Sequence, residues 1–151
     1  MANLEDLGKR IKVLEDIEAI KKLKAKYFHS IDRKRWDKLA ECFSKDGIWE
    51  SGRHKVKLEG VEAIVQFIKG QEGEDHIITT HQGHNPEIEI TSDTTAKGMW
   101  ALYYYKENIK EKIRRQSGAF YDDDYAKENG KWRIKYVRLI TIYSRDSRIE
   151  D

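Results

Sequence analysis

Two histidines are the residues of this sequence best suited to proton transfer. His81 and His84 lie within residues 79–86, close to a segment that alternates as a strand. Free histidine titrates at about pH 6.5, so a histidine on a strand leading to a pocket would suit acid–base chemistry at neutral pH. The other interpretation is a hydrogen-bonded histidine at a sheet edge. The residues alone leave both the interpretation and the choice between the two histidines open.

Asp32 and Tyr27 lie near the end of the first predicted helix. Asp32 directly precedes the second predicted helix, so it could be the N-cap of that helix. It could instead be a carboxylate that holds a histidine in one tautomer and stabilises its cation. A carboxylate turned into a pocket is not turned to a helix end, and the residues alone do not decide between the two roles.

Metal and nucleotide sites are not indicated. Residues three apart on a strand face opposite sides, so His81 and His84 do not form a metal pair, and no cysteine or carboxylate set completes a site. The sequence contains no G-x-G-x-x-G, no P-loop and no G-x-S-x-G motif. We therefore expect no cofactor. The aromatic side chains are expected to form core and pocket wall, and those predicted to bind substrate are Trp49, Trp100, Tyr104 and Phe120.

Helices are predicted mainly in the first half of the chain. Apolar residues recur every three or four positions from residue 4 to 31, and any break is expected near Leu14-Glu15-Asp16. The first turns, to about residue 14, are predicted to be an amphipathic extension that lies on another subunit. A second helix is expected over residues 33–43, ended by Lys45-Asp46-Gly47. A third is expected over residues 60–68, closed by Lys69-Gly70 and followed by a polar loop over 71–75.

Strands are predicted in the rest of the chain. Short strands are expected at 48–50 and 56–58, and longer ones at 76–81, 87–90, 96–106, 112–126 and 131–143. Asn129-Gly130 predicts a hairpin between the last two. This order predicts an α+β fold: a cone-shaped, strongly curved mixed or antiparallel sheet, wrapped by three helices around a deep pocket. The whole chain, residues 1–151, is expected to form one domain.

Composition limits the partners. Lys and Arg number 29 and Asp and Glu number 27, which gives no electrostatic case for binding nucleic acid or an anionic membrane. Cys42 is the single cysteine, the first residues do not resemble a signal peptide, and no apolar run reaches about 20 residues. A cytoplasmic location is therefore expected. Cys42 is interpreted as a small core residue.

Several segments resemble SnoaL-like proteins of the nuclear-transport-factor-2-like superfamily. These are residues 16–28, Asp32-x-x-x-Trp36-Asp37-x-Leu39, His81-x-Gly83-His84-x-Pro86-Glu87-Ile88, Gly118-Ala119-Phe120-Tyr121 and Gly130-Lys131-Trp132-x-Ile134. The resemblance runs from about Leu14 to Tyr143. It is strongest to the bile acid 7α-dehydratase group and more distant to scytalone dehydratase.

The resemblance implies a site and an activity. It places the catalytic tyrosine, carboxylate and histidine on Tyr27, Asp32 and His81, and it implies a homotrimer. The expected function is a cofactor-independent dehydratase acting on a hydrophobic polycyclic or steroid-like hydroxy-ketone. The alternatives are a polyketide cyclase or isomerase on the same scaffold, or a non-catalytic ligand-binding domain.

The sequence departs from the dehydratase group at two pocket positions. Tyr104 stands where that group has a second aspartate, and Thr141 stands where it has an arginine. Arg138 would replace the arginine only if the strand register shifted. An acidic and a basic group are thus missing together, which leaves bile acid recognition open.

Overall fold

Three helices and six strands make up the described part of the chain, residues 3–150 of a computed structural model. The helices are α1 (Leu4–Asp32), α2 (Trp36–Ala40) and α3 (Val61–Glu72). The strands are β1 (Phe43–Ser51), β2 (Val56–Glu59), β3 (Ile77–Ile90), β4 (Thr95–Asn108), β5 (Ile113–Glu128) and β6 (Lys131–Arg148). Residues 1, 2 and 151, which the predicted domain includes, lie outside the described residues.

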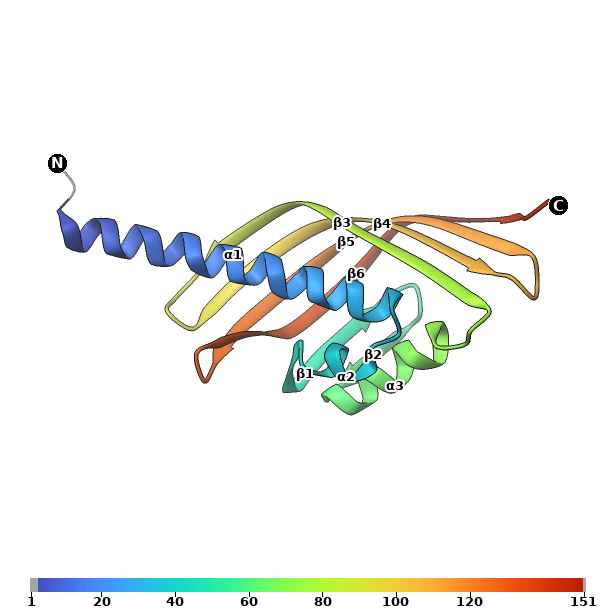
Figure 1. The fold of residues 1–151 in the computed structure, drawn as a ribbon, viewed down its shortest axis with the longest axis horizontal. Helices are drawn as coiled ribbons and strands as arrows, with labels where there is room; N and C mark the ends of the chain where they lie inside the picture. The colour runs from blue at the N-terminus through green and yellow to red at the C-terminus, as the bar shows by residue number, and fades with distance from the viewer. Residues whose placement is uncertain (1–2, 151) are drawn as a thin grey trace.

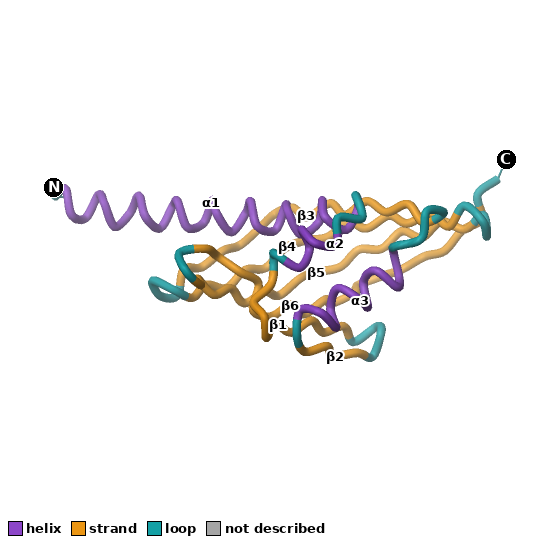
Figure 2. The backbone as a smooth tube through the Cα atoms, turned by 60° about the horizontal axis from the view of Figure 1, so that its bottom comes forward, coloured by secondary structure: helices purple, strands orange, loops and turns teal. Residues whose placement is uncertain are grey.

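The strands form one curved, unclosed mixed sheet in the order β2-β1-β6-β5-β4-β3. β1 is parallel to β6, and the other neighbours are antiparallel. The helices pack on one face of the sheet, with α1 lying across the long strands and α2 and α3 near β1 (Figures 1 and 2). This arrangement confirms the predicted α+β fold with three helices around a curved sheet.

The first helix is continuous, as the helical spacing of its apolar residues predicts, and it has no break near Leu14-Glu15-Asp16. Asn3 caps its first turn: the Asp6 amide donates to Asn3 Oδ1 over 2.8 Å, and Asp6 in turn accepts from the Asn3 amide. Neither proline nor glycine interrupts residues 9–32. The first turns of α1 extend beyond the sheet (Figure 1), where Leu4 is 88% exposed.

The second helix is much shorter than the predicted 33–43. It spans five residues because Phe43 already pairs with Ile134 of β6, and Gly47 lies within β1 instead of ending a helix. Cys42 therefore follows α2 in a turn, where its thiol donates to the carbonyl of Lys38 over 3.3 Å. Burial raises the pKa of this thiol to about 11, which suits a core residue and not a nucleophile.

Several elements extend beyond their predicted ends. The two strands expected at 76–81 and 87–90 are one strand, β3, whose pairing with β4 is irregular between His84 and Glu87. Asn85, at this point, has φ 51°. The third helix continues to Glu72, so residues 71 and 72 are helical and do not form a loop. This extension matters below because it places Glu72 at the pocket.

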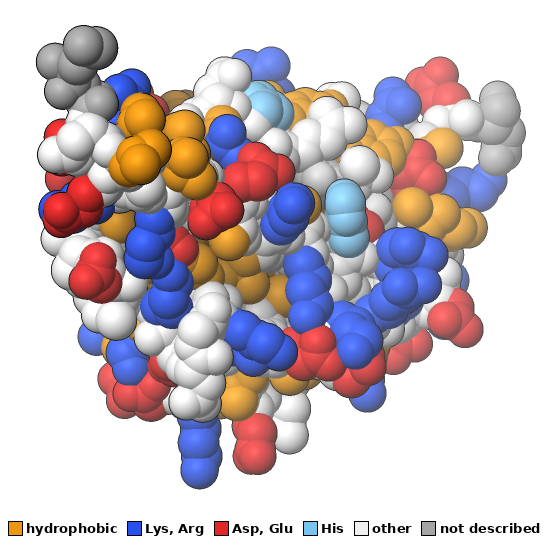
Figure 3. Space-filling view, turned by 60° about the vertical axis from the view of Figure 1, so that its left-hand side comes forward, with side chains coloured by type: hydrophobic (Ala, Val, Ile, Leu, Met, Phe, Trp, Pro, Cys, Tyr) orange, Lys and Arg blue, Asp and Glu red, His pale blue; other side chains and the backbone are white. Residues whose placement is uncertain are grey.

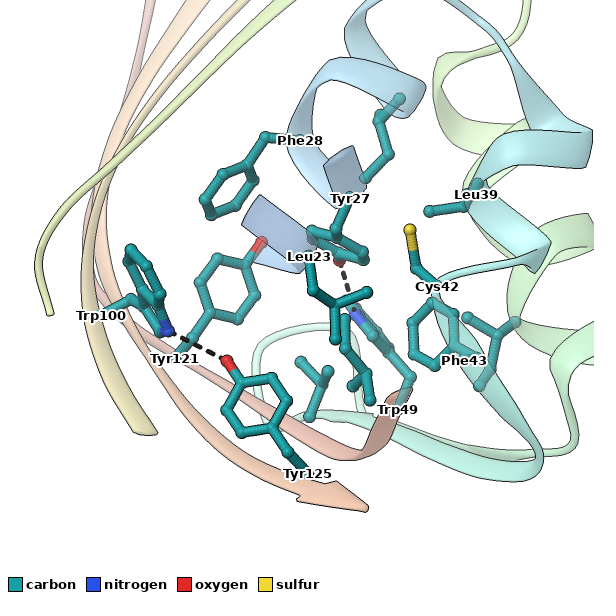
Figure 4. Packing of buried hydrophobic residues seen from close by; sticks show 14 of the residues in the cluster. Leu23, Tyr27, Phe28, Leu39, Cys42, Phe43, Trp49, Trp100, Tyr121 and Tyr125 are labelled. Atoms are coloured by element: carbon teal, nitrogen blue, oxygen red, sulfur yellow. Dashed lines mark hydrogen bonds between the residues drawn. The ribbon is translucent and has the colours of Figure 1, made fainter. Parts of the chain in front are cut away.

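The core lies between α1 and the sheet and is rich in aromatic residues with hydrogen-bonded polar atoms (Figure 4). Trp49 Nε1 donates to the Tyr27 hydroxyl over 3.2 Å, and Trp100 Nε1 donates to the Tyr125 hydroxyl over 3.0 Å. The face seen in Figure 3 carries interspersed charges of both signs. Within residues 3–150, no helix is long and apolar enough to cross a membrane.

Candidate active site

The end of α1 places Asp32 opposite β3. The helix closes through Lys34, which has φ 54°, and the Arg35 amide donates to the Ser30 carbonyl over 2.7 Å. Arg35, and not Asp32, is the N-cap residue of α2. The interpretation of Asp32 as an N-cap was therefore wrong, and its carboxylate is free to face the sheet.

The Asp32 carboxylate binds His81 through both of its oxygens. His81 Nδ1 lies 2.6 Å from Asp32 Oδ1, the His81 amide donates to Oδ2 over 2.9 Å, and the Thr79 hydroxyl donates to Oδ1 over 2.9 Å. The side chains are 18% exposed for Asp32 and 8% for His81. This geometry fixes the position of the histidine ring relative to its own backbone.

Electrostatics keep Asp32 ionised. Burial alone would raise the pKa of this carboxyl, but the hydrogen bonds from the His81 ring and amide and from Thr79, together with the charge of His81, outweigh burial and lower it. An ionised carboxylate only accepts, so His81 Nδ1 carries the proton between them. Nε2 is then the ring nitrogen that can take a proton.

Two aromatic rings pack against His81. Phe28 stacks on the imidazole with 5.9 Å between ring centroids and 16° between ring planes, and the Tyr104 ring lies 4.8 Å away. Gly83 makes room for Phe28, since a Cβ at this position would lie 2.1 Å from the Phe28 ring. His81 and Gly83 are two residues apart and therefore lie on the same face of β3, where both are next to the Phe28 ring.

His81 and Tyr27 line one cavity of about 100 Å³, several times the room that a water molecule needs. Much of its wall is apolar, formed by Ile31, Phe67, Ile68, Leu102, Ala119 and Leu139. Tyr27 is 1% exposed and accepts a hydrogen bond from Trp49. Burial raises the pKa of Tyr27 well above its ordinary value, so the hydroxyl keeps its proton and can donate it.

Two of the four predicted substrate contacts lie at this cavity. Trp49 and Tyr104 line it, whereas Trp100 and Phe120 do not. Trp100 faces the same side of the sheet but packs in the core near Tyr125 (Figure 4). Phe120 alternates with the buried Ala119 and is 37% exposed on the other face. The prediction placed both on the pocket wall and was wrong there.

Histidines other than His81 divide between the surface and the cavity mouth. His84 is exposed, as expected for a residue three positions along the strand. His54 is exposed but also lines the cavity and contacts Phe67, with 6.0 Å between ring centroids. Among residues 3–150, no group of three or more His, Cys, Asp or Glu residues is arranged to hold a metal ion.

Sequence reasoning missed one functional group of this cavity, Glu72. The Tyr104 hydroxyl donates to Glu72 Oε1 over 2.8 Å, and Lys106 Nζ lies 3.6 Å from Oε2. The Glu72 side chain is only 13% exposed. The sequence did contain a signal for it. The helical spacing of apolar residues in 60–68, continued by one turn, predicts a helix that ends at Glu72.

The basic side of the cavity is formed by residues other than Arg138. Thr141 lines the cavity, but Arg138 is exposed, with its Nε 4.0 Å from Glu50 Oε1, and does not line it. The pairing of β6 with β5 has two irregularities, but neither brings Arg138 into the cavity. Arg115 lines the cavity instead and forms two hydrogen bonds to Asp146, of 2.7 and 2.8 Å.

Solved structures with the same fold include proteins of several activities. A scytalone dehydratase-like protein from Novosphingobium aromaticivorans has a TM-score of 0.84 at 22% identity, with 93% of each chain covered. A hexachlorocyclohexane dehydrochlorinase from Novosphingobium barchaimii has a TM-score of 0.82 at 17% identity, covering 91% of this chain and 94% of that one. ActVI-ORFA from Streptomyces coelicolor has a TM-score of 0.72 at 10% identity, covering 83% and 96%.

These identities are low, so the structures establish likeness of fold alone. Membership of a family is shown by the sequence. The family model of the SnoaL-like domain matches residues 12–138, from the first half of α1 to the first half of β6. That range contains both Asp32 and His81. The chain belongs to the SnoaL-like domain family.

Proposed function

We propose that this protein is a cofactor-independent lyase, a dehydratase that acts on a hydrophobic polycyclic or steroid-like hydroxy-ketone. The observation that carries the proposal is the His81–Asp32 pair, with 2.6 Å between ring nitrogen and carboxylate oxygen, beside a cavity lined by both apolar and polar side chains. A histidine whose other nitrogen is held by an ionised carboxylate is a general base of fixed orientation.

The proposed reaction is an elimination. His81 Nε2 takes a proton from the carbon next to the substrate carbonyl, and the electrons of that C–H bond form the new double bond as the C–O bond of the hydroxyl breaks. The proton on His81 then passes to the departing hydroxide, so water leaves and the histidine is neutral again. Asp32 keeps the Nδ1 proton in place and stabilises the imidazolium between the two transfers.

Tyr27 has a separate role in this proposal. Its hydroxyl accepts a hydrogen bond from Trp49 and retains its own proton, which it can donate to the substrate carbonyl oxygen. Negative charge develops on that oxygen as the carbon loses its proton. A single such donor contributes roughly 10²–10³-fold to the rate in comparable sites.

The test is a screen of hydroxylated steroid and polyketide ketones, followed by the formation of the conjugated enone in the ultraviolet. We expect His81→Ala to lower turnover by roughly 10²–10⁴-fold while the protein stays folded. Asp32→Asn should lower turnover while ligand binding persists. His84→Ala is the matched control, since it removes an exposed histidine from the same strand.

Full activity of His81→Ala on an accepted substrate would contradict the mechanism. A different result is turnover that needs His81 but gives a ring-closed or isomerised product without loss of water. That result would support His81 as the base and reject the dehydratase assignment. Bile acid-like compounds should be tested first, although Tyr104 and Thr141 stand where the bile acid 7α-dehydratase group has an acidic and a basic residue.

We also propose that the chain forms one cytoplasmic domain that assembles as a homotrimer. Apolar side chains remain uncovered in two places: Leu7, Ile11 and Leu14 on the first half of α1, and Ile142 and Tyr143 on β6, each between 41% and 65% exposed. A second subunit would cover them. Light scattering that returns the monomer mass of 17.8 kDa at micromolar concentration would reject the assembly.

A further inference from the structure

One carboxylate oxygen in the cavity has no hydrogen-bond donor. Within the described residues, Glu72 Oε2 is buried and receives no hydrogen bond, while Oε1 accepts the Tyr104 hydroxyl. Lys106 Nζ is 3.6 Å from Oε2, too far for a hydrogen bond, and it donates to the Gln71 carbonyl over 2.8 Å. A buried acceptor without a donor is costly, so native structures nearly always provide one.

The missing donor would come from the occupant of the cavity. Glu72 is part of the cavity lining, so a bound molecule can reach it. An anionic group on that molecule would be repelled by the carboxylate. A cationic group is disfavoured as well, because the Lys106 ammonium already lies beside Oε2. A neutral hydroxyl satisfies the oxygen without adding charge.

Tyr104 connects this acceptor to the candidate base. Its ring lies 4.8 Å from the His81 ring, and its hydroxyl is bound to Glu72. Burial and the neighbouring carboxylate raise the pKa of Tyr104, so its proton stays on the hydroxyl and Glu72 stays the acceptor. Tyr104 thus contacts His81 through its ring and Glu72 through its hydroxyl, and all three residues line one cavity.

We propose that Glu72 selects substrates by accepting a hydrogen bond from a hydroxyl group, which is held beside the Tyr104 hydroxyl while the reacting carbon lies at His81. This inference rests on the proposed function and narrows its substrate class to hydroxylated apolar rings.

The experiment measures binding and needs no turnover. The probes are 2-naphthol and 2-methoxynaphthalene, which share an apolar ring and an oxygen acceptor but differ in the O–H donor. Affinities are measured by fluorescence titration for wild type, Glu72→Met, Glu72→Gln and His81→Ala. Glu62→Met is the matched control because Glu62 is exposed on the same helix. Circular dichroism checks that each variant is folded.

We expect wild type and Glu62→Met to bind 2-naphthol about tenfold or more tightly than its methyl ether, as a hydrogen bond to a charged acceptor provides. Glu72→Met should bring the two affinities within about twofold by weakening 2-naphthol binding, and Glu72→Gln should be intermediate. Binding of the ether should hardly change.

Three results would overturn the inference. Equal affinity of wild type for the two probes, or binding of neither up to millimolar concentration, would mean that the cavity has no free acceptor for a hydroxyl. Loss of the preference in His81→Ala but not in Glu72→Met would place the hydroxyl on the histidine. That last result would not contradict the proposed elimination. Full activity of His81→Ala would reject the elimination but would leave the role of Glu72 untouched.

Discussion

Replacing Lys24 by methionine is the sharpest test of how this fold supports its cavity. Lys24 Nζ donates to Asp123 Oδ2 over 2.6 Å, and both side chains are fully buried. The ammonium also lies 3.8 Å from the centre of the Tyr121 ring and 4.8 Å from that of Tyr27, and both tyrosines line the cavity. Lys24→Met keeps the length of the side chain and removes the charge.

The expected cost is about 3–5 kcal/mol of the free energy of unfolding, because removal of one partner leaves a buried charge without compensation. That is a large part of the roughly 5–15 kcal/mol available to a domain. Asp123 keeps one donor, the Tyr125 hydroxyl at 2.6 Å, while its Oδ1 has none in the described structure. Tyr125 alone does not compensate a full negative charge.

The assay is urea unfolding followed by circular dichroism for wild type, Lys24→Met, Asp123→Asn and the double variant. Lys22→Met is the control, since the Lys22 side chain is 76% exposed and should change stability by less than about 0.5 kcal/mol. The double variant should be more stable than the sum of the single changes predicts, because it leaves no unpaired charge.

The pH dependence of the Lys24→Met deficit has a definite sign. Burial raises the pKa of Asp123 although Lys24 opposes this, so loss of Lys24 raises the pKa further. As the pH falls, the folded variant therefore binds this proton before the unfolded chain does, and the deficit shrinks toward about pH 4. A deficit below about 1 kcal/mol at pH 7, or additive single changes, would refute this account of the buried pair.

Two further predictions concern the site. The folded pKa of Asp32 is lowered, so its contribution to stability is present above the unfolded value of about 4 and lost as the pH falls through the folded pKa. Asp32→Asn should therefore flatten the acid limb of a stability curve measured by urea unfolding between pH 5 and about 2, and an unchanged limb would contradict the pairing. Gly83→Ala should displace the Phe28 ring, because the new Cβ would lie 2.1 Å from it, and should lower stability by about 1–3 kcal/mol. Unfolding measurements would show this, with Gly52→Ala, which meets nothing within 4 Å, as the control; equal stability of the two variants would refute the clash.

Periodicity in the sequence determined much of the fold. Apolar residues at helical spacing predicted α1, and alternation together with Asn129-Gly130 predicted the β5–β6 hairpin, because these signals act between residues close in the chain. The ends of elements were predicted less well. The second helix stops early because β1 pairs with β6, a contact between segments some 90 residues apart that no local pattern encodes.

The candidate site divides in the same way. The kinds of residue needed were visible in the sequence, and resemblance to a family pointed to Asp32 and His81, but their contact joins positions 49 residues apart and depends on where α1 ends against β3. Strand phase decided that Ala119 faces inward and Phe120 outward, which composition leaves undetermined. Glu72 became part of the cavity only through one more turn of α3 and a bond to Tyr104 on β4. Local patterns fix which chemistry the chain contains, whereas packing of distant segments decides which of those groups share a cavity.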